Sequence, residues 1–140
     1  MTLFFPIERA TLLIPSGTEQ DPDRKHLFIL LNNPVTDEKL VLLVSLSTLR
    51  PDRPHDPTCI ITPADGAHDF VQRASFVDYS KARIEQDSVL LNGVNAGRFI
   101  PKGTIERGVF TRILQGVLLS PRTPLKCKKF VEQYVSQDIG

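Results

Sequence analysis

Polar side chains with catalytic chemistry are concentrated between residues 50 and 79. Two of the three histidines and one of the two cysteines of the chain fall in this stretch. Four prolines interrupt it and apolar runs flank it, a pattern typical of a site carried on loops between strands. The side chains that could bind or react are Arg50, Arg53, His55, Asp56, Cys59, Asp65, His68, Arg73, Ser75 and Tyr79.

One interpretation of this cluster is a metal site. His55, Cys59 and His68 could supply nitrogen and sulfur ligands, and Asp56 or Asp65 could add an oxygen. The spacing of these residues matches no closed structural zinc pattern, and a second cysteine pair is missing. We therefore predict that the protein binds no metal and needs no cofactor.

A second interpretation is nucleophilic catalysis by Cys59 or by a serine paired with histidine. The sequence contains no Gly-x-Ser-x-Gly motif. Cys59 lies in an apolar, strand-like run and not at the start of a helix, where the pKa of a thiol is lowered. We expect both Cys59 and Cys127 to be small buried side chains.

The third interpretation is cleavage of RNA without a metal ion. RNA carries its own nucleophile, the 2′-hydroxyl, so the protein must supply a base for that proton, an acid for the departing 5′-oxygen and a cation for the charged phosphorane. The competing possibility is that Ser75 and Tyr79 make ordinary turn hydrogen bonds and that Arg73 is solvated. The hypothesis assigns catalysis to Ser47, Thr48, His68, Arg73 and Ser75, and substrate binding to Arg50, His55, Tyr79 and Lys81.

Composition is that of an ordinary globular domain. The 140 residues, 41% hydrophobic and 24% charged, fit a single domain over residues 1–140. The net charge of +1 gives no general attraction to nucleic acid or to a membrane. No apolar run approaches the roughly 20 residues that span a bilayer, and no signal peptide is recognisable. With only two cysteines, we expect a reduced, cytoplasmic protein.

Apolar runs in the first part of the chain predict short strands. Two of them are apolar on both faces, as expected for central strands of a small barrel or a closely covered sheet. Turn residues such as Asn33-Pro34 and Asn92-Gly93 separate the runs. The predicted strands cover residues 7–14, 26–32, 39–47, 58–62, 70–77 and 83–91.

Helical spacing of apolar residues begins only after residue 100. The spacing predicts an amphipathic helix over 104–118 with Thr104 as its cap. Thr123 as cap and Pro124 at the first helical position start a second helix. The fold class is therefore α+β: a small antiparallel barrel over about residues 1–100, followed by two C-terminal helices over about residues 101–140. The second helix is expected to bury Cys127, Phe130, Val131 and Tyr134.

The residues around the cluster also resemble a known family. The similarity extends over roughly residues 26–85 and is to the compact bacterial PemK/MazF-like toxins, above all to a poorly characterised branch of that superfamily. The segments that carry it are His26-Leu-Phe-Ile-Leu-Leu, Leu43-Val-Ser45-Leu-Ser47-Thr48, His55-Asp56-Pro-Thr-Cys59 and Asp65-Gly-x-His68-x-Phe70-Val71-x-Arg73-x-Ser75-x-Val77-x-Tyr79-x-x-Ala82.

The resemblance implies an SH3-like barrel, usually dimeric, that cuts single-stranded RNA and is neutralised by a cognate antitoxin protein. It implies that a Ser or Thr at the end of a strand, together with a nearby basic residue, serves in cutting the RNA. The matching position here is Ser47-Thr48. The Gly-rich loop that carries this basic residue in the family is absent, and the acidic stretch 19–23 replaces it. Either Arg73 or His68 supplies the cation, or the chain is a non-catalytic module that recognises a protein or nucleic acid partner.

Overall fold

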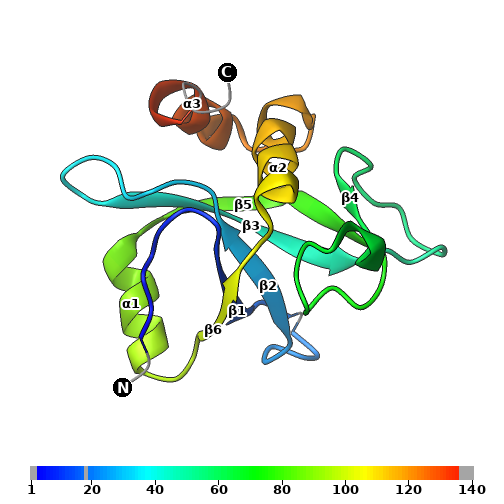
Figure 1. Ribbon diagram of the computed structural model, residues 1–140, viewed down its shortest axis with the longest axis horizontal. Helices are drawn as coiled ribbons and strands as arrows, with labels where there is room; N and C mark the ends of the chain where they lie inside the picture. The colour runs from blue at the N-terminus through cyan, green and yellow to red at the C-terminus, as the bar shows by residue number, and fades with distance from the viewer. Residues whose placement is uncertain (1–2, 18, 136–140) are drawn as a thin grey trace.

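The computed structural model describes residues 3–17 and 19–135. In these ranges six antiparallel strands form one sheet in the order β4-β5-β3-β2-β1-β6. The sheet curls into half of a barrel (Figure 1). The strands are β1 (Ala10–Pro15), β2 (Lys25–Leu30), β3 (Leu40–Thr48), β4 (Ile60–Ile61), β5 (Ser75–Gln86) and β6 (Ile100–Thr104).

Helices cover both faces of this sheet. α2 and α3 lie on one face, which we call the α2–α3 face, and α1 lies on the opposite, α1 face (Figure 1). The prediction of an α+β fold with a small, curled antiparallel sheet is confirmed at this level. The helices are α1 (Asp87–Asn95), α2 (Arg107–Leu119) and α3 (Leu125–Tyr134), with a short 3-10 helix, η1 (Pro63–Asp65), in the loop after β4.

The side chains of β3 explain why its sequence is apolar throughout. Leu42, Val44 and Leu46 join the main core beneath α2 and α3, whereas Val41 and Leu43 join a smaller core beneath α1. Successive side chains of a strand point to opposite faces, so a strand covered on both sides needs apolar residues at every position. Beyond Leu43 the α1 face of β3 carries serines instead. The α1 face is therefore apolar at one end and polar at the other.

A bulge between β3 and β5 increases the curl of the sheet. Leu43 pairs with Arg83, but Ser45 pairs with Asp78, so the register shifts between these two pairs. Extra residues on one strand bend it and raise its twist. On the Ser45 side of the bulge, Phe76 and Asp78 of β5 pair with Ser47 and Ser45 and lie with them on the α1 face.

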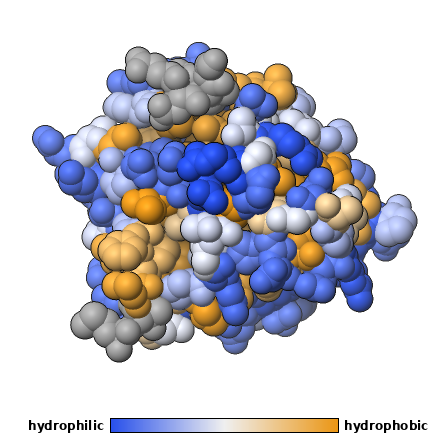
Figure 2. Space-filling view, in the orientation of Figure 1, coloured by the Kyte–Doolittle hydropathy of each residue, from blue (hydrophilic) through white to orange (hydrophobic). Residues whose placement is uncertain are grey.

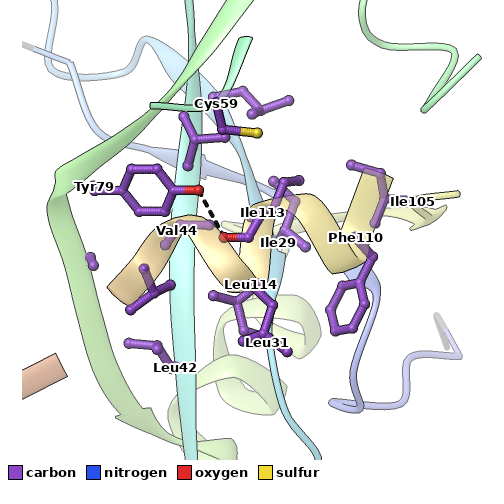
Figure 3. Packing of buried hydrophobic residues seen from close by; sticks show 14 of the residues in the cluster. Ile29, Leu31, Leu42, Val44, Cys59, Tyr79, Ile105, Phe110, Ile113 and Leu114 are labelled. Atoms are coloured by element: carbon purple, nitrogen blue, oxygen red, sulfur yellow. Dashed lines mark hydrogen bonds between the residues drawn. The ribbon is translucent and has the colours of Figure 1, made fainter. Parts of the chain in front are cut away.

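Tyr79 anchors α2 to β5 inside the main core. Its side chain is fully buried, and its hydroxyl donates to the carbonyl oxygen of Ile113 at 2.7 Å (Figure 3). Burial raises the pKa of Tyr79, so the phenol remains protonated and able to donate. The ring lies against the backbone of α2 at Gly116, where a Cβ atom would overlap the Tyr79 oxygen and lie 2.6 Å from Cζ. Glycine at this position therefore permits the helix to approach the strand.

Two elements between β5 and α2 were not predicted. The segment 83–91, predicted as a strand, follows β5 only to Gln86 and then forms the first turns of α1. Asn92-Gly93, predicted as a turn, lies inside this helix. The ring of Phe99 occupies the space that a side chain on Gly93 would fill, so packing explains the glycine. β6 follows and pairs with β1.

The caps of the two C-terminal helices also differ from the prediction. Thr104 ends β6, and the Glu106 carboxylate caps α2 by accepting hydrogen bonds from the backbone of Gly108 and Val109. α3 has Pro124 as its N-cap residue, and its helical residues begin one position later. Tyr134, expected to be buried, is 39% exposed. The other three predicted core residues of α3 are buried: Cys127, Phe130 and Val131.

Both cysteines are buried and free, as predicted. Cys59 lies in the main core beside β4, and Cys127 lies in α3. Burial raises the pKa of each thiol. Neither is therefore placed or activated as a nucleophile.

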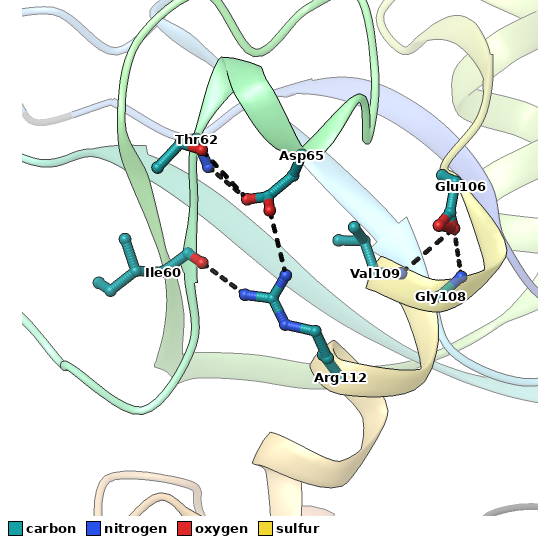
Figure 4. A network of polar contacts seen from close by, with 7 residues as sticks. All are labelled: Ile60, Thr62, Asp65, Glu106, Gly108, Val109 and Arg112. Atoms are coloured by element: carbon teal, nitrogen blue, oxygen red, sulfur yellow. Dashed lines mark hydrogen bonds and ion pairs between the residues drawn. The ribbon is translucent and has the colours of Figure 1, made fainter.

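Arg112 connects α2 to the loop after β4. Its Nη2 donates to the carbonyl oxygen of Ile60 at 2.7 Å, and its Nη1 lies 3.6 Å from Asp65 Oδ1 (Figure 4). The same carboxylate accepts a hydrogen bond from the backbone N–H of Thr62 at 2.8 Å. These contacts hold β4 and η1 against the start of α2.

A buried carboxylate joins the segment before β4 to the end of α2. Asp56 is 1% exposed; its Oδ2 accepts from Ser120 Oγ at 2.5 Å, and its Oδ1 accepts from the backbone N–H and hydroxyl of Thr58 at 2.9 and 2.5 Å. Burial acts to raise the pKa of Asp56, but these hydrogen bonds and the charge of Arg122 together hold it below its usual value. The ionised form is thus the form that the fold binds.

We expect Asp56→Asn to destabilise the protein by about 1–3 kcal/mol at neutral pH, because a charged hydrogen-bond acceptor is replaced in a buried site. The pKa of Asp56 is lower in the folded than in the unfolded state, so its ionised form stabilises the fold at any pH above the unfolded pKa. This contribution is lost as the pH falls through the folded-state pKa. Denaturant unfolding between pH 7 and 3 measures it. The gap between native and variant should close as the pH falls below about 4; a constant gap would contradict the assignment.

The surface mixes hydrophilic areas with a few apolar ones, as Figure 2 shows for one side. Across the residues that the structure describes, none of the helices has the length and apolar character needed to cross a membrane.

Candidate functional site

The polar end of the α1 face is hollowed into a cavity of about 270 Å³. Three parts of the chain form its walls: the loop between β1 and β2, the end of β3 with the residues that follow it, and β5. We call it the basic cavity. Its charged and polar lining residues are Ser16, Asp21, Arg24, His26, Ser47, Thr48, Arg50, Arg53, His55, Asp78 and Lys81, and Phe76 also lines it.

Positive charge predominates in the basic cavity. Four side chains carry fixed positive charge, and two carboxylates oppose them. Lys81 lies 3.8 Å from Asp78, but Arg24, Arg50 and Arg53 form no ion pair with any residue that the structure describes. Among the described residues, these three exposed guanidinium groups thus line one cavity without ion-pair partners. Such an arrangement suits an anion, and arginine forks match phosphate oxygens.

Local backbone bonds position these arginines. The N–H of Arg53 donates to the carbonyl oxygen of Arg50 at 3.2 Å, which forms a turn that brings both side chains to one wall. On the opposite wall, the N–H of Ser16 donates to the carbonyl oxygen of Arg24 at 2.8 Å. This bond closes the loop between β1 and β2 and places Arg24 at the cavity.

His26 is held by Ser16 at the start of β2. The Ser16 hydroxyl has one proton, which it donates to the carbonyl oxygen of Ile14 at 3.2 Å. Its oxygen lies 2.6 Å from His26 Nδ1, so we assign the ring proton to Nδ1, which donates to Ser16 Oγ. Nε2 then carries the lone pair, and it has no hydrogen-bond partner in the described part of the chain. His26 is thus arranged to accept a proton.

The electrostatic setting keeps His26 neutral. Partial burial lowers the pKa of His26, and the positive charges of Lys81 and Arg24 lower it further, while Asp78 acts in the opposite direction. The net pKa lies below the usual value of 6.5. A neutral imidazole with a free nitrogen, surrounded by cations, suits a general base that acts next to an anion.

Five of the nine predicted site residues line this cavity. Ser47 and Thr48 end β3 at its rim, and the other three supply two positive charges and an imidazole. The five are Ser47, Thr48, Arg50, His55 and Lys81.

His68 lies at another place in the fold. Its Nδ1 accepts from the N–H of Phe70 at 3.0 Å, and its Nε2 lies 2.6 Å from the carbonyl oxygen of Lys102 and 3.0 Å from Thr11 Oγ1. Both ring nitrogens are therefore occupied by contacts that fasten the loop after η1 to β6 and β1. The predicted catalytic role of His68 conflicts with this structural one.

The remaining predicted site residues lie in two environments: Arg73 and Ser75 line a second hollow, and Tyr79 lies in the core. Ser75 is 8% exposed and donates to the carbonyl oxygen of Arg73 at 3.0 Å; both line a second hollow against Ser47 and Thr48. Tyr79 is inside the main core and is not among the residues that line the basic cavity. The prediction that Ser75 and Tyr79 face the same way is correct, but they face the core. The Tyr79 side chain is therefore not accessible from the surface.

Sequence analysis missed Phe76 and Asp78 of β5, and the residues of the loop between β1 and β2 with the start of β2. The acidic stretch 19–23 hid the fact that Arg24, Lys25 and His26 follow it directly and form a basic triplet at the start of a strand. That triplet was the available signal. Arg24, at the end of this acidic loop, lines the basic cavity together with Arg50 and Arg53.

The residues once considered as metal ligands do not converge. His55 lines the basic cavity, Cys59 is in the main core, and His68 is fastened to β6. Across residues 3–17 and 19–135, no three side chains of the His, Cys, Asp or Glu type meet in a metal-binding arrangement.

Comparison of the chain with protein-family models, with curated proteins and with solved structures finds no match in any of the three. The functional interpretation therefore depends on the cavity and on the resemblance seen in the sequence.

Proposed function

We propose that the basic cavity is the active site of a toxin-like endoribonuclease, which cleaves single-stranded RNA without a metal ion and belongs to a bacterial toxin–antitoxin system. The observation that carries the proposal is the convergence of three unpaired arginines with a neutral histidine whose Nε2 is free. The resemblance to PemK/MazF-like toxins supports it independently, because it selects the Ser47-Thr48 strand end that forms the rim of the same cavity.

The residues of the cavity can be assigned to the steps of the reaction. His26 Nε2 takes the proton of the 2′-hydroxyl, the 2′-oxygen forms a bond to phosphorus, and the bond from phosphorus to the 5′-oxygen breaks. His55, on the wall of the same cavity, is the group that gives a proton to the departing 5′-oxygen. The products are a 2′,3′-cyclic phosphate and a 5′-hydroxyl, and the protons balance.

The arginines stabilise the charge that develops during this reaction. The phosphorane carries one more negative charge than the starting diester, and Arg24, Arg50 and Arg53 line the site without other partners to compete for them. Positive charge already placed where negative charge develops stabilises the transition state relative to the bound diester. Ser47 and Thr48 add hydroxyl donors at the rim.

The resemblance also extends the proposal to partners, a homodimer and a cognate antitoxin. Support comes from exposed apolar side chains of the N-terminal segment and of α1, in the region where Figure 2 shows an apolar area at lower left. Leu3 is 77% exposed, Phe5 61% and Val89 39%. Sedimentation of the purified chain measures whether it is a dimer. Sedimentation with a candidate antitoxin measures whether the two form a complex.

A second function is a non-catalytic module that binds the phosphate backbone through the same arginines. It is favoured by the position of His68 and Tyr79, two of the predicted site residues, outside the cavity. The two functions differ at His26, because binding without cleavage does not require a base.

The decisive experiment is incubation of the purified protein with single-stranded RNA in excess EDTA. We expect cleavage that is unchanged by EDTA and fragments ending in a 2′,3′-cyclic phosphate, detected by mass spectrometry of the fragments. RNA that stays intact at high protein concentration would rule out the nuclease, and activity lost only with EDTA would rule out the metal-free mechanism.

A further inference from the structure

A nucleobase-stacking surface adjoins the arginines in the basic cavity. Phe76 lies on the α1 face of β5, opposite in direction to the buried Val77, and is partly exposed where it lines the cavity. It is the one side chain with a carbocyclic ring among the cavity's lining residues. The apolar ring of Phe76 cannot bind phosphate, but it gives this wall of the cavity a flat face on which a base could lie.

The surroundings of Phe76 suit a flat ligand. The ring of His55 lies 5.6 Å from that of Phe76, centroid to centroid, and the two planes are tilted by 41°. A tilted neighbour supports the ring from one side and leaves part of it accessible. Ser47 pairs directly with Phe76 across the sheet, so its hydroxyl lies beside the ring on the same face.

We propose that Phe76 stacks against an unpaired base next to the scissile phosphate, with Ser47 at the edge of that base. The inference rests on the proposed function, since it names the part of the substrate that the arginines do not contact. Phosphate contacts carry no information about the bases, whereas stacking requires a base whose face is free. The site therefore selects single-stranded RNA through Phe76 and binds it through the arginines.

Binding of short oligonucleotides separates the two contributions in the native protein. The probes are a 2′-O-methyl RNA hexamer, which cannot be cut, the same hexamer with one central abasic position, and its duplex; fluorescence anisotropy gives each Kd. We expect the abasic and duplex probes to bind about 10- to 100-fold more weakly than the intact single strand. Equal affinity for the intact and abasic strands would overturn the stacking inference while leaving the arginine site in place. No binding of any probe would overturn the proposed function.

Variants then assign the effect to one ring. Phe76→Leu keeps apolar volume and should abolish the preference for the intact strand, without changing the dependence of Kd on salt. Phe76→Tyr keeps an aromatic face and should retain the preference. Arg53→Ala is the matched control: the preference should remain, and the slope of log Kd against log salt should fall by about 0.7, the loss of one phosphate contact to a single strand. A preference that survives Phe76→Leu would contradict the assignment to Phe76.

Discussion

His26→Gln should lower the rate of RNA cleavage by about 10²- to 10⁴-fold, the usual contribution of a general base. Glutamine can still contact Ser16 but cannot accept and hold a proton at the position of Nε2. The affinity for uncleavable RNA should change little, because the arginines of the cavity remain. Single-turnover cleavage and anisotropy on the same preparation measure both quantities. If the native protein cleaves and His26→Gln binds without cleaving, the protein is a nuclease with His26 as its base. If the native protein itself binds RNA but does not cleave it, the protein is the binding module.

The same substitution at the second histidine is the control. His68 lies outside the cavity, with both ring nitrogens engaged by Phe70, Lys102 and Thr11. We expect His68→Gln to lower stability and to leave the cleavage rate of the folded protein within a few-fold of native. If His68→Gln abolished cleavage and His26→Gln did not, the assignment made from the sequence would be right and the one made from the structure wrong.

The pH dependence gives a second check on His26. The neutral ring is the active form, so cleavage should rise with pH through the pKa of His26, which lies below 6.5. Lys81→Met removes a positive charge that lowers this pKa, so the acidic limb of the pH–rate profile should move to higher pH. Asp78→Asn removes a charge that raises it, so the limb should move to lower pH. Shifts in the same direction would contradict the assignment.

The sequence predicted the centre of the sheet well because burial on both faces leaves a clear pattern. β2 and β3 lie close to the predicted ranges for this reason. α1 was missed because the alternation of polar and apolar residues in β5 continues into its first turns. In addition, the pair Asn92-Gly93 is typical of a turn. Only the position of Phe99 shows that this glycine accommodates a ring inside a packed helix.

Only part of the candidate site could be predicted from the sequence, and the reason again lies in the strand pattern. Alternation correctly placed Ser75 and Tyr79 on one face of β5, but a strand pattern does not say which face a helix will cover. α2 covers that face, so the open site is built from the opposite set, Phe76 and Asp78. Nearness in sequence to Ser75 likewise made His68 look catalytic. The contribution of His26, from the other side of the cavity, depends on strand order.

Gly116→Ala should destabilise the fold by about 2–4 kcal/mol, since the new methyl group would overlap the Tyr79 hydroxyl and force either the ring or α2 to move. Thermal and denaturant unfolding measure the loss. Gln115→Ala, one position away on the exposed side of α2, should stay within about 0.5 kcal/mol of native.

A double-mutant cycle tests whether Tyr79 is the cause. Tyr79→Phe alone should cost about 1 kcal/mol, because the bond to the Ile113 carbonyl is lost. In that background Gly116→Ala should cost about 1 kcal/mol less than in the native chain, because the overlapping oxygen is gone. Additive costs would show that another contact limits the approach of α2. Since β5 carries Tyr79 on one face and Phe76 on the other, the same variants should leave RNA affinity unchanged below their unfolding temperature, which separates support of the sheet from the chemistry of the cavity.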